Sequence, residues 1–365
     1  NNHKNYLSKN KQRNSKIILN NYTYIIIIVK LFKMIYLYNI MRIVVTGGNG
    51  MIGSCIKDII NIYPTCVFTF LTRKIVDLTK ENDVLEYFQN NNFNYIIHLA
   101  ADVGGLFKNL EKNVQMFENN MKINMNVLKA CHENNIKRGI FILSSCIYPH
   151  EPSVFPMDEN MIHEGPAHPS NEGYAYAKRM MEMQCRHYNK TYNTEYICLI
   201  PVNLYGPYDN FHLDDGHFVP AVLHRFYNSK LYNTDFLVYG TGKPYRQFLY
   251  GPDFAFIICE ILLKLNNVNT WTKNQNIIVC NDEEYTIKQV IYQLCDSMNI
   301  DKTKVTWDIN LSDGCMKKTV NNSRLKTILP NISPGFKFTN LKKGLKKTYL
   351  WFHENFHNNI ENIQR

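Results

Sequence analysis

Three side chains in the middle of the chain have the types and spacing needed to move a proton at a substrate oxygen. Tyr174 and Lys178 are four residues apart, so on a helix they share one face. A tyrosine with its ordinary pKa of about 10 is a poor acid–base group at neutral pH, but a neighbouring ammonium group stabilises the phenolate and lowers that pKa. Ser144, expected at a strand end, can hydrogen-bond the same oxygen. We therefore interpret Ser144, Tyr174 and Lys178 as a catalytic set.

A glycine-rich turn upstream has the spacing of a phosphate-binding loop. Residues 47–53 follow the pattern Gly-x-x-Gly-x-x-Gly, directly after a predicted strand and at the start of a predicted helix. Glycines at these positions permit a tight turn and let backbone N–H groups approach a pyrophosphate at the helix N-terminus. The alternative is a glycine-rich turn that binds nothing. The pattern favours a dinucleotide held by Gly47, Gly50, Met51, Ile52 and Gly53.

The residues after the second predicted strand indicate which dinucleotide binds. A site that prefers NAD places an acid there to bind the ribose 2′-hydroxyl group. This chain has Leu71-Thr72-Arg73-Lys74 instead, and the two cations fit a 2′-phosphate, which favours NADP. The alternative is that both are solvated surface charges. Asp77 and Leu78 are expected to border the adenine.

The elements that must position these residues alternate between strand and helix. Short apolar runs predict strands, and apolar residues at helical spacing predict helices between them. The first half has strands at 42–46, 67–71, 95–99, 139–144 and 196–201, and helices at 51–62, 81–90, 113–134 and 174–192. The second half has strands at 236–239, 277–280 and 304–308, and helices at 219–229, 253–265, 286–299 and 338–352. This order predicts an α/β, Rossmann-like, doubly wound parallel sheet with a smaller α/β substrate-binding domain.

Charge and cysteine content exclude some other classes of protein. Residues 1–40 contain seven basic and no acidic residues, which leaves only +3 of the total charge of +10 for the rest of the chain. A nucleic-acid surface is therefore not indicated. The ten cysteines form no Cys-x-x-Cys pair and no zinc-type spacing, so we expect buried thiols, a reducing compartment and no metal.

The N-terminal residues stand apart from the alternating pattern. Residues 1–40 are mostly Asn, Lys, Tyr, Ile and Leu, and their longest apolar run is too short for a membrane span of ~20 residues. A targeting segment, a basic tail and translated sequence upstream of a start at Met41 are alternatives, of which the last is favoured. The expected organisation is an NADP-binding domain at 41–205, a mainly substrate-binding and interleaved domain at 206–355, and a tail at 356–365.

Taken together, these motifs resemble the extended short-chain dehydrogenase/reductase family. Further segments are similar to one group within it, the GDP-L-fucose synthases, which act as 3,5-epimerases and 4-reductases. The resemblance covers residues 41 to about 355. It is carried by residues 98–107, 144–149, 203–212, 215–217, 240–248 and 312–314, with Lys317 and Lys318.

The resemblance implies a substrate, GDP-4-keto-6-deoxy-D-mannose, and roles for further residues. The C4 ketone acidifies the hydrogens on C3 and C5, and inverting those carbons needs acid–base groups on both faces of the sugar. The matching residues are Cys146 and His217, the second of which also contacts the cofactor. NADPH then delivers hydride to C4 and Tyr174 protonates the oxygen. Lys178 and Asn203 match residues beside the nicotinamide ribose and the nicotinamide.

The substrate site implied by the resemblance consists of Arg225, Tyr239, Arg246, Asp313 and Lys318. Two arginines suit a diphosphate, because guanidinium groups bind its oxygens bidentately. Three positions depart from the family. Asn49 replaces an arginine that lies beside the 2′-phosphate in bacterial members, Tyr239 replaces a tryptophan, and Val202 replaces a threonine. The first departure leaves Arg73 to bind the 2′-phosphate.

Two rival functions stay open at this stage. One is a redox-neutral nucleotide-sugar epimerase or dehydratase that retains NAD, although a dehydratase would be expected to have an acid pair where Cys146-Ile147 stands. The other is a non-catalytic dinucleotide-binding regulator, although such proteins usually lose the tyrosine or lysine that this chain keeps. The family resemblance further implies a cytoplasmic homodimer, joined through helices near 115–134 and 174–192, with no membrane partner.

Overall fold

A parallel sheet of six strands forms the centre of the molecule. The structure is a computed structural model that describes residues 40–266, 276–310, 313–357 and 363, so the N-terminal extension lies outside the described residues except for Ile40. The strand order is β10-β5-β4-β3-β1-β2, and every neighbouring pair is parallel. The strands are β1 (Met41–Thr46), β2 (Cys66–Leu71), β3 (Tyr95–His98), β4 (Arg138–Ile142), β5 (Glu195–Pro201) and β10 (Asn276–Val279).

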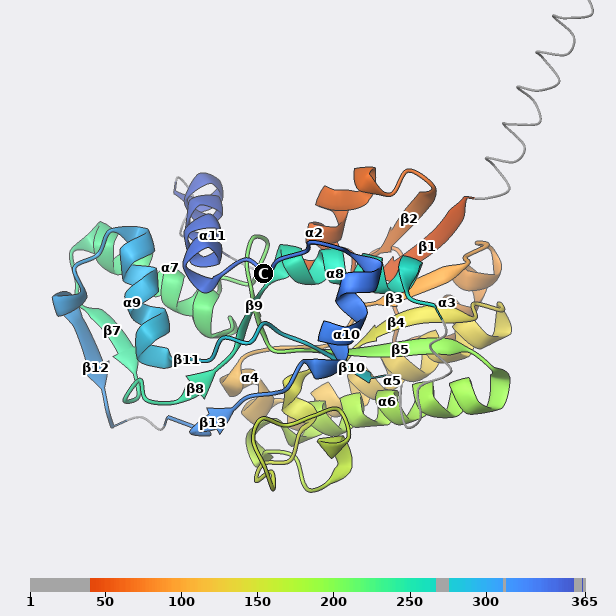
Figure 1. Cartoon of the computed structure of the whole chain (residues 1–365), viewed down its shortest axis with the longest axis horizontal. Helices are drawn as coiled ribbons and strands as arrows, with labels where there is room; N and C mark the ends of the chain where they lie inside the picture. The colour runs from red at the N-terminus through yellow and green to blue at the C-terminus, as the bar shows by residue number, and fades with distance from the viewer. Residues whose placement is uncertain (1–39, 267–275, 311–312, 358–362, 364–365) are drawn as a thin grey trace, which may run out of the picture.

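Helices cover both faces of this sheet (Figure 1). On one face α2 (Met51–Ile59) packs against α8 (Gly251–Lys264), with α10 (Ser323–Ile332) beside them. On the other face α5 (Asn113–Glu133) packs against α3 (Glu81–Gln89) and α6 (Glu172–Tyr192), and α4 (Leu106–Glu111) precedes α5. Because both faces are covered, the strands are apolar throughout, and Ile43, Val44 and Val45 of β1 are fully buried. The predicted doubly wound α/β fold is confirmed.

A smaller part lies at one end of the sheet and has its own apolar core. It contains α7 (Phe218–Tyr232), α9 (Ile287–Met298) and α11 (Leu341–Phe356), with buried residues such as Phe226, Leu294 and Phe352 between them. Its strands form three small sheets. They are β6 (Asn203–Tyr205) with β9 (Phe248–Tyr250), β7 (Phe236–Tyr239) with β12 (Val305–Asp308), and β8 (Tyr245–Arg246) with β11 (Tyr285–Thr286) and β13 (Lys317–Lys318).

Several elements differ from the sequence-based expectation. The helix expected at 51–62 ends at Ile59 and continues as a 3-10 turn, Ile60–Ile62. The helix α10 was missed because Pro330 interrupts its helical pattern, and β6 and β9 were missed because three residues give no usable period. Further 3-10 turns are Ser145–Ile147, Met161–His163, Pro169–Asn171 and Lys302–Lys304. Over the described ranges, no helix is long and apolar enough to cross a membrane.

One buried side chain, that of Gln247, ties the two parts together. Its Nε2 donates to the carbonyl oxygens of Val320 at 3.2 Å and Asn281 at 3.3 Å, and its Oε1 accepts from the Val320 N–H at 2.8 Å. The Gln247 carbonyl accepts from the Asn203 side chain at 2.8 Å. Only 3% of Gln247 is exposed, so water cannot replace these bonds.

Replacing Gln247 by Ala should lower the free energy of unfolding by about 2–4 kcal/mol, because it leaves the buried Val320 N–H and the Asn281 carbonyl without their partner and removes the amide donor from the Val320 carbonyl. Urea denaturation followed by circular dichroism measures the change. The exposed Gln89 at the end of α3 supplies the matched control, and its replacement by Ala should change stability by less than ~0.5 kcal/mol. Equal effects of the two substitutions would contradict the role given to Gln247.

Candidate active site

The glycine turn lies between the ends of β1 and β3 and the start of α2. Gly47 has a φ of +70°, and a Cβ atom there would lie 2.9 Å from the Ala100 nitrogen. A Cβ on Gly53 would lie 2.7 Å from the Gly47 carbonyl oxygen. These two close approaches need glycine, and they bring the backbone N–H groups at the start of α2 to the carboxyl edge of the sheet. The room and the donors suit a pyrophosphate.

Two large cavities open at this edge, each with a volume of about 940 Å³. The first, here called the glycine cavity, is lined by the glycine turn and by residues that follow β2. Of the predicted cofactor residues it contains Gly47, Gly50, Met51, Ile52, Gly53, Arg73, Asp77, Leu78, Lys178, Asn203 and His217. The second, here called the arginine cavity, contains the predicted substrate residues Arg225, Tyr239, Arg246, Asp313 and Lys318.

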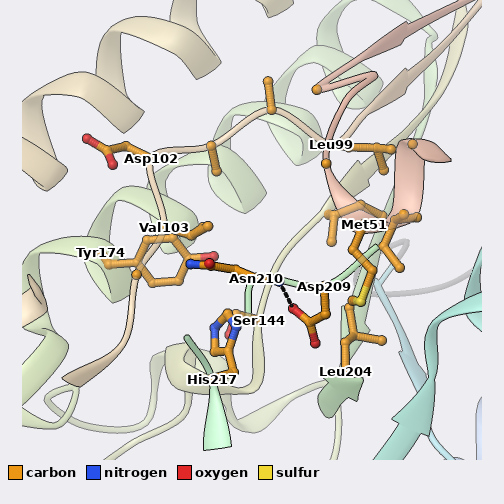
Figure 2. Close-up of a pocket in the computed structure, with 18 of the residues that line it drawn as sticks. Met51, Leu99, Asp102, Val103, Ser144, Tyr174, Leu204, Asp209, Asn210 and His217 are labelled. Carbon is orange, nitrogen blue, oxygen red and sulfur yellow. Dashed lines mark hydrogen bonds between the residues drawn. The ribbon is translucent and has the colours of Figure 1, made fainter. Parts of the chain in front are cut away.

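The two cavities meet at the predicted catalytic residues. Ser144, Cys146, Tyr174 and His217 line both of them, as does Asn203. Figure 2 shows Tyr174, Ser144 and His217 on one side of the glycine cavity and Met51, Leu99 and Leu204 on the other. A ligand in either cavity therefore ends at the same group of side chains.

Tyr174 and Lys178 both come from α6, one turn apart. The Lys178 ammonium donates to the Ile142 carbonyl oxygen at 2.7 Å and lies 5.9 Å from the centre of the Tyr174 ring. Burial lowers the pKa of Lys178 to about 8. Burial also raises the pKa of Tyr174 well above its usual value, and the nearby Cys146 raises it further. The prediction that Lys178 lowers the tyrosine pKa is wrong here, because desolvation of the phenolate dominates. The phenol of Tyr174 is therefore protonated at neutral pH.

Cys146 and Ser144 are held by the short turn that follows β4. The Ser144 hydroxyl oxygen accepts from the Cys146 N–H at 3.2 Å and caps the 3-10 helix Ser145–Ile147. This contact fixes the backbone of Cys146 next to the Ser144 hydroxyl group. His217 lies at the N-cap position of α7, in extended backbone, and approaches the same place from the smaller part of the molecule. The half-buried thiol and the imidazole thus come from different parts of the chain.

Cations dominate the arginine cavity. The Arg225 guanidinium stacks over the Tyr239 ring at 4.4 Å from its centre. Arg246 lies in β8 directly beside Lys318 of β13, and burial lowers the pKa of its guanidinium. The backbone N–H and the hydroxyl group of Thr241 both donate to the Asp313 carboxylate, at 2.6 and 2.5 Å. Asp313 thus also holds the loop after Tyr239 in place, and nothing in the amino-acid sequence indicated this role.

Other polar residues of the site were not predicted. The Asp209 side chain accepts from the Asn210 N–H at 2.8 Å, while its second oxygen is buried and has no hydrogen-bond partner in the described part of the chain (Figure 2). Burial raises the pKa of Asp209 to about 7. Asp102 pairs with Lys108 at 2.8 Å, and both line the glycine cavity. Asp102 lies in segment 98–107 and Asp209 in segment 203–212. Both segments carry the family resemblance, and that resemblance was the sequence signal that could have identified these acids.

The His150 and His168 rings form a further pair in the arginine cavity, with centres 4.3 Å apart. Burial lowers the pKa of His168, and the nearby His150 and Lys318 lower it further. Among the residues that the structure describes, no group of three His, Cys, Asp or Glu side chains is arranged to hold a metal ion.

Comparison with known proteins agrees with this geometry. Residues 43–277 match the NAD dependent epimerase/dehydratase family. The chain is 38% identical to GDP-L-fucose synthase of Dictyostelium discoideum over 318 residues, which are 86% of this chain and 96% of that protein. It is 31% identical to GDP-L-fucose synthase of Escherichia coli K12, over 86% of this chain and 97% of that protein.

A solved structure shows the same architecture. The crystal structure of a GDP-L-fucose synthetase from Naegleria fowleri bound to NADP is 33% identical, with a TM-score of 0.77, and covers 87% of this chain and 95% of that one. The chain therefore belongs to the NAD-dependent epimerase/dehydratase family and, within it, to the GDP-L-fucose synthases.

Proposed function

We propose that this protein converts GDP-4-keto-6-deoxy-D-mannose into GDP-L-fucose, inverting C3 and C5 and then reducing C4 with NADPH. The observation that carries the proposal is the meeting of the glycine and arginine cavities at Ser144, Cys146, Tyr174 and His217. A dinucleotide in one cavity and a sugar nucleotide in the other would place their reacting ends at these side chains. The relatives named above support the same activity.

The glycine cavity would hold NADPH, as the related Naegleria fowleri enzyme binds NADP. Gly47, Gly50, Met51, Ile52 and Gly53 would take the pyrophosphate, and Arg73 the 2′-phosphate. Asp77 and Leu78 would border the adenine, and Lys178 and Asn203 the nicotinamide end, with His217 beside them. When bound, the dinucleotide supplies the hydride that reduces C4 of the sugar.

The arginine cavity would hold the GDP part of the substrate. Arg225, Arg246 and Lys318 supply positive charge for the diphosphate, and burial of Arg246 strengthens its attraction for a phosphate oxygen. Tyr239, which is 45% exposed, offers an aromatic face. Asp313 would act as a substrate ligand and as the acceptor that holds Thr241.

Epimerisation needs one group that removes a proton from carbon and another that returns one from the opposite face. The ketone at C4 takes up the electron pair as an enolate when C3 or C5 loses its proton. Cys146 and His217 are suited to this exchange, because they reach the junction of the cavities from β4 and from α7. Each inversion consumes and restores one proton at carbon, so no net redox change occurs in these steps.

Reduction then uses the same junction. Ser144 hydrogen-bonds the C4 oxygen, and Tyr174 donates its proton to that oxygen as hydride arrives at the carbon. The raised pKa of Tyr174 keeps the phenol protonated until this moment. The ketone gains one hydride and one proton and becomes an alcohol, and one NADPH is oxidised. Lys178 supplies positive charge one helical turn away from the tyrosine.

The structure of the site also weighs against the rival functions. Cys146-Ile147 stands where a 4,6-dehydratase would be expected to place an acid pair. Tyr174 and Lys178 are both present on the cavity wall, which a non-catalytic regulator would have no need to keep.

The assembly and location form a further part of the proposal. A homodimer would form through α5 and α6, and the exposed apolar side chains Val114, Phe117 and Met125 on α5 support such a contact. A cytoplasmic location fits the buried free thiols of seven cysteines. Residues 41–205 would bind mainly the cofactor, and residues 206–355 mainly the substrate.

Purified protein mixed with NADPH and GDP-4-keto-6-deoxy-D-mannose should oxidise one NADPH for each GDP-L-fucose formed, as followed by absorbance and by product chromatography. Tyr174→Phe should slow this reduction by about 10²–10⁴-fold, because the proton donor is lost. An absence of NADPH oxidation with this ketone would end the proposal.

Cys146→Ser should reduce epimerisation by roughly 10²–10⁴-fold, because a hydroxyl group is a far weaker base than a thiolate. Deuterium uptake at C3 and C5 in heavy water without NADPH measures this step by NMR. Reduction of the ketone by NADPH should fall much less. Cys66→Ser, at the start of β2 and outside both cavities, is the control. Equal loss of both activities would argue against the role of Cys146 as a base.

The affinity for NADPH should fall as the pH rises through about 8, where Lys178 of the free enzyme loses its proton. Below this pH the ammonium is charged and favours the anionic dinucleotide, and above it that charge disappears. Fluorescence titration of NADPH at a series of pH values measures this affinity. A constant affinity up to a pH of about 9.5 would show that Lys178 does not titrate in this range.

A further inference from the structure

The glycine turn and the end of β2 meet at one corner of the glycine cavity. The Gly48 N–H donates to the Leu71 carbonyl oxygen at 2.8 Å, which fastens the turn to the last residue of β2. Asn49 on the turn and Arg73 after the strand are both exposed, and both line the cavity. A 2′-phosphate on the adenosine ribose belongs at this corner, because the residues after the second strand contact that ribose.

A 2′-phosphate carries about −1.5 to −2 charges at neutral pH, so one arginine neutralises only part of it. Asn49 is neutral and cannot supply the remainder, and Lys74, the other cation after β2, is exposed and does not line the cavity. Lys57, in the second turn of α2, is not part of the cavity wall but is hydrogen-bonded to Asn49, which is. Its Nζ donates to the Asn49 Oδ1 at 3.1 Å.

The position of the Lys57 ammonium is restrained by a further contact, with an aromatic ring. It lies 5.1 Å from the centre of the Phe70 ring, on the edge strand β2, and its stem is half-buried. No carboxylate lies within ion-pair distance of it in the described ranges, and the neighbouring Asp58 accepts from the Tyr208 hydroxyl group at 3.2 Å. An ammonium group has three donors, and Asn49 takes one of them. Donors therefore remain for an anion.

We propose that Lys57, positioned by Asn49 and Phe70, is the second cation of the 2′-phosphate site and that it acts with Arg73 to select NADPH over NADH. This inference rests on the proposed use of NADPH, and it adds a selectivity residue from α2 that the glycine turn and the strand end do not contain. Asn49 has the role of a bridge, because its side chain links the turn to the lysine. Selectivity then depends on the contact between α2 and the turn.

Binding of NADPH and NADH to the protein, measured by isothermal titration calorimetry, tests the inference without catalysis. Lys57→Gln keeps the stem against Phe70 and a hydrogen-bonding end but removes the charge. It should weaken NADPH about tenfold and leave NADH within about twofold, while Lys57→Arg should retain the preference. Titration with 2′,5′-ADP and 5′-AMP should show the same difference.

The control is Lys304→Ala, which removes one charge from an exposed turn in the smaller part of the molecule and should change neither affinity. Unchanged NADPH affinity in Lys57→Gln, or equal weakening of both dinucleotides, would overturn the inference while the wild-type preference for NADPH stands. A wild-type protein that binds both dinucleotides equally would instead overturn the proposed cofactor, and this inference with it.

Discussion

All six strands of the central sheet run in the same direction, and this single constraint places the glycine cavity and the side chains that follow β4. Parallel strands end at a common edge, so the residues that follow β1, β2 and β4 are neighbours there although they lie up to about a hundred positions apart. Gly47, Arg73 and Ser144 each come just after one of these strands. The helices on both faces exclude water from the sheet, whereas this edge is open to a ligand through the two cavities.

Burial at this edge decides the protonation states. The same desolvation raises the pKa of Tyr174 and lowers that of Lys178, because it disfavours both the phenolate and the ammonium ion. The tyrosine thus keeps the proton it must give away, while the lysine becomes sensitive to mild alkali. The spacing of the two residues suggests that each sets the pKa of the other. In the folded protein, burial shifts the pKa of each side chain more than its neighbour does.

Local patterns predicted the sheet and the position of the glycine turn well. The turn at Gly47, the strands around it and the pair Tyr174 and Lys178 are all encoded by spacing within short segments. The features that escaped prediction depend on contacts between distant segments. Gln247 bridges residues 203, 281 and 320, and no sequence period marks it. The buried carboxylate of Asp209 and the contact between Lys57 and Asn49 likewise become visible only when the turn, the helix and the loop are placed together.

The common wall of the two cavities has a thermodynamic consequence. Ser144, Tyr174, Asn203 and His217 belong to the surface of both, so the ligands proposed for the two cavities would contact the same side chains. Linkage requires that any factor by which the dinucleotide changes the affinity for the sugar nucleotide be returned in full when the order of binding is reversed. The side chains proposed to carry out the chemistry are thus also the ones through which any such coupling between the two cavities would pass.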